Sequence, residues 1–142
     1  MRELQSITEG GTIYANFGSQ SHIDTDTFTH STSTNSDNIT VDRAGLYQII
    51  GNFVFINAAA SARNTVRVSV RVNGTTQNTT ASFDYDRGSS YGEFSNNKIN
   101  TIIDLNANDV IDFEVFGQNI DGTCSLDASF TEVIMTRIGK SG

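Results

Sequence analysis

One thirteen-residue stretch, Gly45–Asn57 (GLYQIIGNFVFIN), constrains the fold of this chain more than any other feature. Successive side chains of an extended strand point to opposite faces, so its odd-numbered residues form one face and its even-numbered residues the other. Both faces carry aromatic or aliphatic residues, whereas a strand with one face in water alternates apolar and polar residues. Both faces of this strand therefore need cover. We expect one cover from a second sheet and the other from a second copy of the protein.

Strand patterns continue along the chain, and no helical period competes with them. Thr65–Val72 and Val110–Phe116 are apolar on one face and charged on the other, which predicts that their sheet meets water. The segments around 46–56, 99–105 and 126–138 are apolar on parts of both faces. The sequence therefore predicts an all-β protein, a two-sheet antiparallel sandwich of the jelly-roll kind, with one sheet facing water and one sheet covered on both faces.

The remaining segments predict turns, loops and short strands. Asn73-Gly74 predicts a tight hairpin, because both residues tolerate a positive φ. Residues 1–11 carry little pattern, end in Gly10-Gly11 and are expected to form an arm outside the fold. We further expect a first strand at 12–17, a long loop at 18–38 with a short strand near Phe28, a short strand at 39–41, a loop at 58–64, an edge strand at 75–83, a second long loop at 84–97 and a closing strand at 125–138.

Composition narrows the range of partners. The 142 residues suit one domain, and 9 Lys and Arg against 16 Asp and Glu give a net charge of -7. Such a protein is repelled by phosphate backbones, so nucleic acid is not an expected partner. The chain shows neither a signal peptide nor a membrane-spanning apolar run, which predicts synthesis in a cytoplasm and no membrane partner. The single cysteine, Cys124, is expected to be a buried structural thiol.

Reactive groups are sparse. Nucleophilic catalysis needs a nucleophile, a base and an orienting group, and only His22 and His30 could supply an imidazole base. Both lie in a polar loop, where solvated histidines are the rule, so we expect no catalytic residue, no enzyme activity and no cofactor. The carboxylate pairs Asp24/Asp26, Asp84/Asp86 and Asp109/Asp112 could hold Ca²⁺, but solvated loop acids are favoured and no metal site is predicted.

An aromatic cluster is the one further candidate for ligand binding. Tyr85, Tyr91 and Phe94 fall in the expected loop at 84–97, which also contains Gly88 and Gly92. Aromatic side chains on such a loop could contact a glycan or a protein. Ordinary packing within the loop is an equally good interpretation, and the residues alone do not choose between the two.

Four short motifs, in this order and spacing, resemble those of the C1q/TNF-like trimeric jelly rolls over about residues 28 to 138. Asp42–Tyr47 (DRAGLY) resembles the start of the family's central strand, and Val70–Gly74 (VRVNG) resembles its hairpin. Leu105–Val110 (LNANDV) resembles its tight turn, and Ser129-Phe130 its final strand. Asn108 departs from the family's usual Gly, and Thr131-Glu132 replaces the Gly that usually follows Phe. The closing strand is therefore expected to bend differently.

The resemblance implies a homotrimer whose three-fold axis lies against the doubly covered sheet. The candidates for a mixture of core and axis residues are Tyr47, Phe53, Phe55, Ile102, Phe130 and Met135. The polar sequence without a signal peptide is most similar to the bacteriophage branch of this architecture, where such domains serve as head decoration proteins or fibre tips.

Because the sequence begins at Met1 and ends soon after the jelly roll, a decoration (cement) protein on the capsid surface of the virion is favoured, with the major capsid protein as partner. A receptor- or glycan-binding fibre tip is the alternative. On this interpretation residues 1–27 form the arm and first strand, and residues 28–142 form the jelly-roll domain. The arm candidates for capsid contact are Arg2, Leu4, Ile7, Ile13 and Tyr14.

Overall fold

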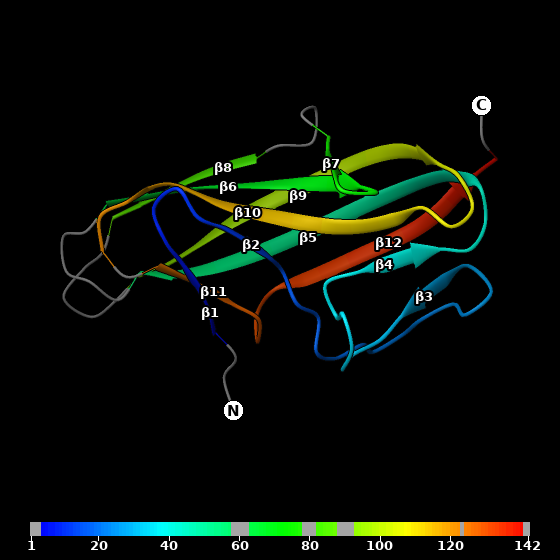
Figure 1. Cartoon of the computed structure of the whole chain (residues 1–142), viewed down its shortest axis with the longest axis horizontal. Helices are drawn as coiled ribbons and strands as arrows, with labels where there is room; N and C mark the ends of the chain where they lie inside the picture. Colours follow the sequence, from blue (N-terminus) through cyan, green and yellow to red (C-terminus); the bar gives the residue numbers. More distant parts are fainter. Residues whose placement is uncertain (1–3, 58–62, 78–81, 88–92, 123, 141–142) are drawn as a thin grey trace.

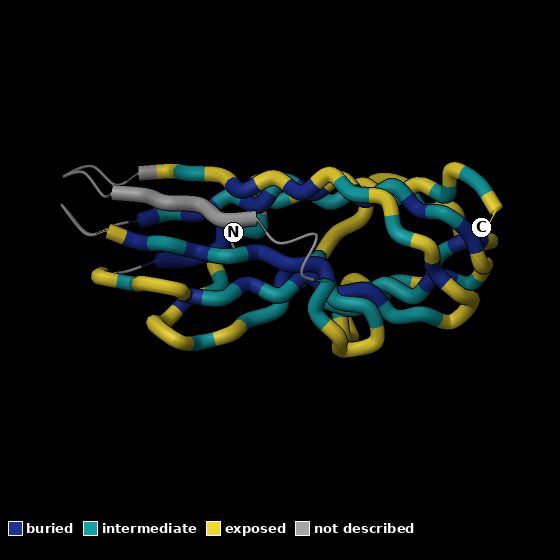
Figure 2. Tube along the Cα trace, turned by 90° about the horizontal axis from the view of Figure 1, so that it is seen from above, coloured by how far each residue is buried: buried dark blue, intermediate teal, exposed yellow. Residues whose placement is uncertain are grey.

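The computed structural model describes residues 4–57, 63–77, 82–87, 93–122 and 124–140. These residues form strands β1 to β12 and no helix. The strands pair antiparallel in two sheets that lie face to face, as Figures 1 and 2 show. The predicted all-β class and the two antiparallel sheets are therefore confirmed.

The first sheet is built around β5 (Gly45–Asn57), the strand that the sequence singles out. On one side β9 (Glu93–Leu105) pairs with β5 along its whole length, from Gly45 opposite Leu105 to Asn57 opposite Glu93. On the other side β11 (Cys124–Asp127) and β12 (Glu132–Gly139) pair with successive parts of β5. The short β1 (Leu4–Ile7) pairs with β11 and completes this five-stranded sheet.

The second sheet has seven strands, with β10 (Val110–Ile120) and β6 (Arg63–Val72) at its centre. Along β10 lie β2 (Thr12–Tyr14) and β4 (Ile39–Val41), and β3 (Phe28–His30) lies outside β4. Along β6 lie β7 (Thr75–Thr76) and β8 (Ser82–Arg87). The predicted short strands near Phe28 and at 39–41 are thus present, and the segment after the hairpin is an edge.

The core lies between the inner faces of the two sheets. The odd-numbered residues of β5 point inward, and Tyr47, Ile49 and Phe53 are completely buried. They meet the valines of β6 and the apolar residues of β10, and the rings of Phe53 and Phe113 lie 5.4 Å apart between centroids. Burial raises the pKa of Tyr47, whose hydroxyl donates a hydrogen bond of 2.5 Å to the backbone oxygen of Arg43. The predicted inward faces of β6 and β10 are confirmed.

Two turns use the left-handed conformations that their sequences predict or permit. Asn73 has a φ of 50° and Gly74 a φ of 81°, which suits the tight hairpin between β6 and β7. Asn108, in the turn between β9 and β10, has a φ of 72°. Asparagine is one of the few residues other than glycine that adopts this conformation at low cost. Asn108 can therefore occupy the place where the C1q/TNF-like motif has glycine.

The predicted loop at 84–97 is mostly strand, so that expectation was wrong. Ser82–Arg87 forms β8, and β9 already begins at Glu93. Residues 93–98 are rich in Ser and Asn, which disfavour strands, but β5 offers them a complete backbone partner. Pairing with a long neighbouring strand overrides weak local preference. Residues 88–92 and 58–62 lie outside the described residues.

The expectation that residues 1–11 form an arm outside the fold was wrong for the part from Leu4 onward. Pairing with β11 places Ile7 in the core, where it is 3% exposed. The Gln5 side chain donates to the backbone oxygen of Tyr14 at 2.8 Å and accepts from the backbone nitrogen of Asn16 at 3.0 Å. These bonds join β1 in one sheet to β2 and the following residue in the other, so residues 4–16 close one end of the sandwich.

The predicted closing strand at 125–138 is interrupted. The chain turns between β11 and β12, where the backbone nitrogens of Phe130 and Thr131 both donate to the backbone oxygen of Asp127, at 3.2 and 3.1 Å. The Asp127 carboxylate also accepts from the backbone nitrogen of Ser129 at 3.1 Å. This turn places Phe130 on the surface of the five-stranded sheet, 59% exposed.

Candidate functional site

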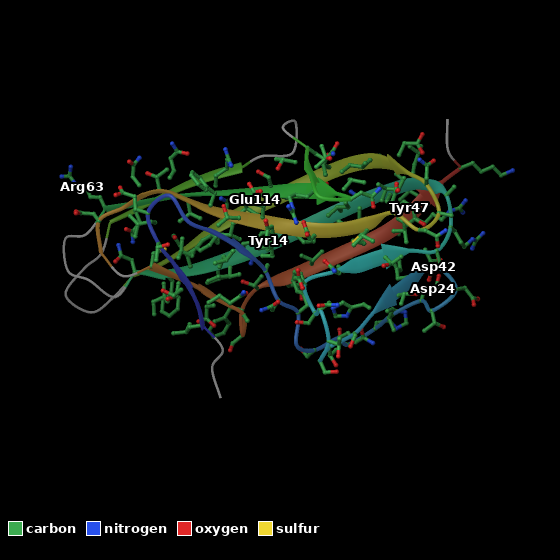
Figure 3. The ribbon with its side chains drawn as sticks, viewed as in Figure 1. Tyr14, Asp24, Asp42, Tyr47, Arg63 and Glu114 are labelled. Carbon is green, nitrogen blue, oxygen red and sulfur yellow. The ribbon has the colours of Figure 1, made fainter. Side chains whose placement is uncertain are left out.

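The outer face of the seven-stranded sheet carries charges, and four of them on β6 and β10 are paired within the chain. The Arg71 guanidinium donates two hydrogen bonds to the Asp112 carboxylate, at 2.7 and 2.5 Å. Arg67 donates to Glu114 at 3.2 Å. The two guanidinium groups also lie over aromatic rings, Arg71 over Tyr14 at 4.1 Å and Arg67 over Phe116 at 4.9 Å. Figure 3 shows Tyr14 beside Glu114 on the neighbouring strands β2 and β10.

These four charged side chains of the seven-stranded sheet therefore have their partners within the same chain. Hydrogen bonds from Arg71 to Asp112 raise the pKa of Arg71 above its ordinary value. The Arg71 and Asp112 side chains are only 18% and 9% exposed, so their charges depend on each other rather than on water. The predicted charged outer side chains of β6 and β10 are present, but at the centre of this face they cover one another, since Ser69 and Asp112 are buried.

The outer face of the five-stranded sheet is different, because it is apolar and open. All the exposed large hydrophobic residues among the described ones belong to this sheet or to the turn between β11 and β12. They are Leu4, Ile50, Phe94, Ile102, Phe130, Ile134 and Ile138, with exposed fractions from 39% for Ile50 to 59% for Phe130. The half-buried Leu46, Val54 and Ile56 lie on the same outward side of β5. We call the surface formed by these ten residues the apolar face.

The strand register arranges these side chains in rows across the sheet. Ile50 stands opposite Asn100 on β9 and opposite Ile134 on β12. Ile56 stands opposite Phe94, whose ring packs edge-on against Phe130 at a centroid distance of 6.4 Å. The amides on this face pair with one another, Gln48 with Asn100 at 3.3 Å and Asn96 with Asn52 at 3.1 Å. Contiguous apolar surface with few charges is typical of a protein interface rather than of a monomer's exterior.

The six residues that the sequence proposes for core and axis separate into two groups. Tyr47, Phe53 and Phe55 are buried in the core, and Met135 is half-buried and packs against the core from the inner face of β12. Ile102 and Phe130 are more than half exposed on the apolar face. The predicted axis candidates did not include Ile50, Ile134 and Ile138. The period of two nevertheless places Ile134 and Ile138 on one face with Phe130.

The candidates for capsid contact also separate. Ile7 is buried and Ile13 packs against the core, so both side chains are used inside the sandwich. Tyr14 lies under the Arg71 guanidinium. Leu4 remains on the surface at 50% exposure. Arg2 lies outside the described residues.

Two of the three aromatic residues of the expected ligand loop lie on strands. Tyr85 belongs to β8, and Phe94 belongs to β9 and contributes to the apolar face. Tyr91 lies outside the described residues. Two of the three residues therefore sit on strands of different sheets.

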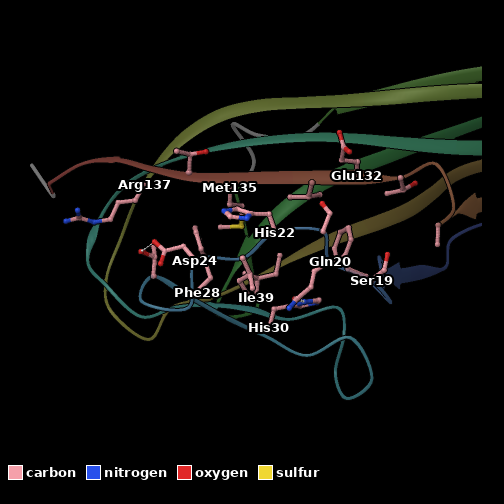
Figure 4. A pocket seen from close by; sticks show the side chains of 18 of the residues that line it. Ser19, Gln20, His22, Asp24, Phe28, His30, Ile39, Glu132, Met135 and Arg137 are labelled. Carbon is pink, nitrogen blue, oxygen red and sulfur yellow. Dashed lines mark hydrogen bonds between the residues drawn. The ribbon is translucent and has the colours of Figure 1, made fainter.

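A cleft opens where the edges of the two sheets are not joined. Strands β1 and β2, which belong to different sheets, close one part of this side of the sandwich, whereas β12 faces β3 and β4 across a cleft of about 650 Å³. Half-buried apolar residues line it from both sheets, namely Phe17, Phe28, Ile39, Val133 and Met135. Around them stand His22, Asp24, His30 and Arg137, whereas the Glu132 side chain at the rim lies on the other side of β12 from Met135, as Figure 4 shows.

Most polar groups of this cleft are held by their neighbours. The His30 ring nitrogens contact Gln20 Oε1 at 2.9 Å and the Ser36 backbone oxygen at 3.0 Å. Asp24 accepts hydrogen bonds from the Thr27 hydroxyl and the Asp26 backbone nitrogen, which lower the pKa of its carboxyl. In the part of the chain that the structure describes, the His22 side chain forms no hydrogen bond or ion pair, so it is available to a bound polar molecule.

The remaining candidates have structural roles where they are described. Asp109 accepts hydrogen bonds from Asn73 and from the backbone of Asn106, and Asp112 pairs with Arg71. Among the described residues, no three His, Cys, Asp or Glu side chains gather closely enough to hold a metal ion. Cys124 is 2% exposed, as predicted. No helix in the described ranges is long and apolar enough to cross a membrane.

Comparisons with protein-family models and with curated proteins give no match.

Proposed function

We propose that this protein is a structural component of a phage particle, a homotrimeric jelly-roll protein whose subunits associate through the apolar face and which decorates and stabilises the head. The observation that carries the proposal is that every exposed large hydrophobic residue among those described lies on one sheet or in the turn that joins two of its strands. A monomer gains nothing from such a surface, whereas a subunit interface needs one.

The energetics are consistent with assembly. Burying a large aliphatic or aromatic side chain stabilises by about 1.5–3 kcal/mol, so removing the remaining half of its exposure contributes roughly 1 kcal/mol. Association costs about 4–15 kcal/mol in lost freedom of motion. One or two such residues could not hold subunits together, but the apolar face offers seven exposed ones on each subunit.

The assignment to a virion, the jelly-roll topology and the trimer rest on the four motifs that resemble the phage branch of the C1q/TNF-like proteins. The proposed partner outside the trimer is the major capsid protein. Since residues 4–16 close the sandwich, the shell contact is proposed to come from the assembled trimer rather than from a free arm.

Reconstitution on particles tests the proposal. Heads prepared without this protein would be mixed with increasing amounts of the purified trimer and sedimented. Saturable binding at a fixed number of trimers per head, with heads that withstand higher temperature before releasing DNA, is the expected result. A trimer that stays in the supernatant at every concentration would overturn the decoration function while leaving the trimer intact.

Receptor or glycan binding at a fibre tip is the second candidate, and the cleft between β12 and β3 favours it. Its volume lies within the range of small-ligand sites, about 300–1,000 Å³, and it combines apolar walls with a few polar groups. A glycan array probed with the wild-type protein and with His22→Ala and Gln20→Ala, two residues that line the cleft, tests it. Thr34→Ala, exposed in the loop between β3 and β4, is the control. Binding that the two cleft variants lose and the control keeps would support this function, and binding to no glycan would oppose it.

A further inference from the structure

Two charged residues stand in one row of the apolar face. Lys98 on β9 and Glu132 on β12 are both exposed, and both stand opposite Asn52 of β5, so the three residues form one row across the sheet. The next row on one side contains Ile50 and Ile134, and on the other side Val54 stands opposite Asn96. The two charges therefore lie inside the surface that the proposed function covers with another subunit.

These two charges do not neutralise each other within one chain. One strand separates them, so their backbones are about 9–10 Å apart at the usual spacing of strands. The Asn52 side-chain oxygen between them accepts a hydrogen bond from Asn96. The ion pairs among the described residues, Arg67 with Glu114 and Arg71 with Asp112, belong to the other sheet. Neither the Lys98 nor the Glu132 side chain forms a hydrogen bond or ion pair in the described part of the chain.

A covered face would remove both charges from water, and a charge buried without a partner is strongly unfavourable. The covering surface must therefore present an acid to Lys98 and a base to Glu132. A second copy of this chain does both, because it carries the same two residues in the same row. A face of uniform charge, or an entirely apolar one, would leave both side chains unsatisfied.

We propose that Lys98 of one subunit forms an ion pair with Glu132 of the neighbouring subunit across the apolar face, and that this pair sets the register of the assembly. The proposal rests on the proposed function, since it needs a second copy on this face. Buried polar pairs are best attested in this register-setting role. The other charges near this row are less suited to it. Arg137 already donates to the Ala44 backbone oxygen, and Asp104 lies six residues from Lys98 along β9.

A charge-exchange experiment tests the pair. The variants are Lys98→Glu, Glu132→Lys and the double exchange, and their mass is measured by sedimentation velocity over a range of protein concentrations. Asp121→Lys is the matched control, because it makes the same charge change as Glu132→Lys in the exposed turn between β10 and β11. Circular dichroism verifies that each variant is folded.

We expect each single reversal to weaken association by about 100-fold or more, because it puts like charges together in a desolvated site. The double exchange should restore association to within about tenfold of the wild type, and Asp121→Lys should not change it. If the single variants associate as the wild type does, or if the double variant does not recover association, the proposed ion pair is refuted while the trimer is not. If the wild-type protein is a monomer, both the proposed function and the pair are wrong.

Discussion

The two outer faces of this sandwich differ in whether their outward side chains find partners within the same chain. On the seven-stranded sheet, arginines and carboxylates pair across β6 and β10, and the two guanidinium groups lie over the rings of Tyr14 and Phe116. On the five-stranded sheet the corresponding positions hold isoleucine, phenylalanine and amides. The first face is complete in one chain. The second exposes side chains that a monomer would be expected to bury.

Because of this difference, substitutions on one face should affect the stability of the subunit, and substitutions on the other should affect its assembly. Substitutions on the charged face should change the free energy of unfolding of the subunit, because partners within the chain are lost. Substitutions on the apolar face should change association, because in one chain these side chains already contact water. Matched variants on the two faces test this difference.

The largest effect is expected from a charge at the centre of the apolar face. Ile134→Asp places a carboxylate beside Ile50, and an unpaired charge in a covered apolar site costs several kcal/mol. We expect the trimer to dissociate to folded monomers, as measured by light scattering and circular dichroism. The matched variant Thr12→Asp, exposed on the charged face, should remain a trimer. Equal behaviour of the two variants would contradict the distinction between the faces.

A smaller effect, and one on stability alone, is expected from Asp112→Ala. It leaves the Arg71 guanidinium, 18% exposed, without its carboxylate, which should reduce the free energy of unfolding by about 3 kcal/mol. Urea denaturation below the concentration at which trimers form measures this. Replacing both partners, as Arg71→Met with Asp112→Leu, should recover most of the loss. A trimer weakened by Asp112→Ala would show that the charged face takes part in assembly.

Arg67→Ala should have a still smaller effect, a loss of about 1 kcal/mol in the free energy of unfolding. Arg67 is 31% exposed and makes one hydrogen bond to Glu114 together with its contact over Phe116. Arg67→Met keeps a stem over the ring and should lose roughly half as much. The same denaturation experiment distinguishes the two variants, and a loss as large as that of Asp112→Ala would be contrary to this ranking.

The smallest effect is expected from Gln48→Ala, on the apolar face. The Gln48 amide makes one long hydrogen bond, 3.3 Å, to the exposed Asn100, so its removal should change subunit stability by less than about 0.5 kcal/mol. Association should change little as well, because Ile102 on the neighbouring strand remains. A strong loss of association would mean that polar contacts, rather than isoleucines, hold the subunits together.

Much of this comparison can be predicted from periodicity. The two apolar faces of Gly45–Asn57 and the alternating charges at 65–72 and 110–116 depend only on the period of two, and both expectations hold. Contacts between distant segments are not predictable in this way. Ile7 is isolated in a polar N-terminus, and only its pairing with β11 places it in the core. Residues 93–98 become strand because β5 is long enough to pair with them.

Phe130 is a further residue whose surroundings cannot be predicted from periodicity. Its position between two apolar segments is consistent with one continuous strand, in which it would share a face with Ile134. The turn at Asp127 instead breaks the strand and presents the ring to Phe94 of β9. The cleft beside β12 is also a product of tertiary structure, since His22 and Met135 are far apart in the sequence and line the same cleft only because the two sheets separate there.

The central claim, that the apolar face is a subunit interface, is tested most directly by the absolute mass of the purified protein in solution. One chain has a mass of 15.4 kDa, so a trimer has about three times that, roughly 46 kDa. Light scattering should give the trimer mass for the wild-type protein at micromolar concentration. A stable species at 15.4 kDa would contradict the claim and would require a different partner for the exposed isoleucines and phenylalanines.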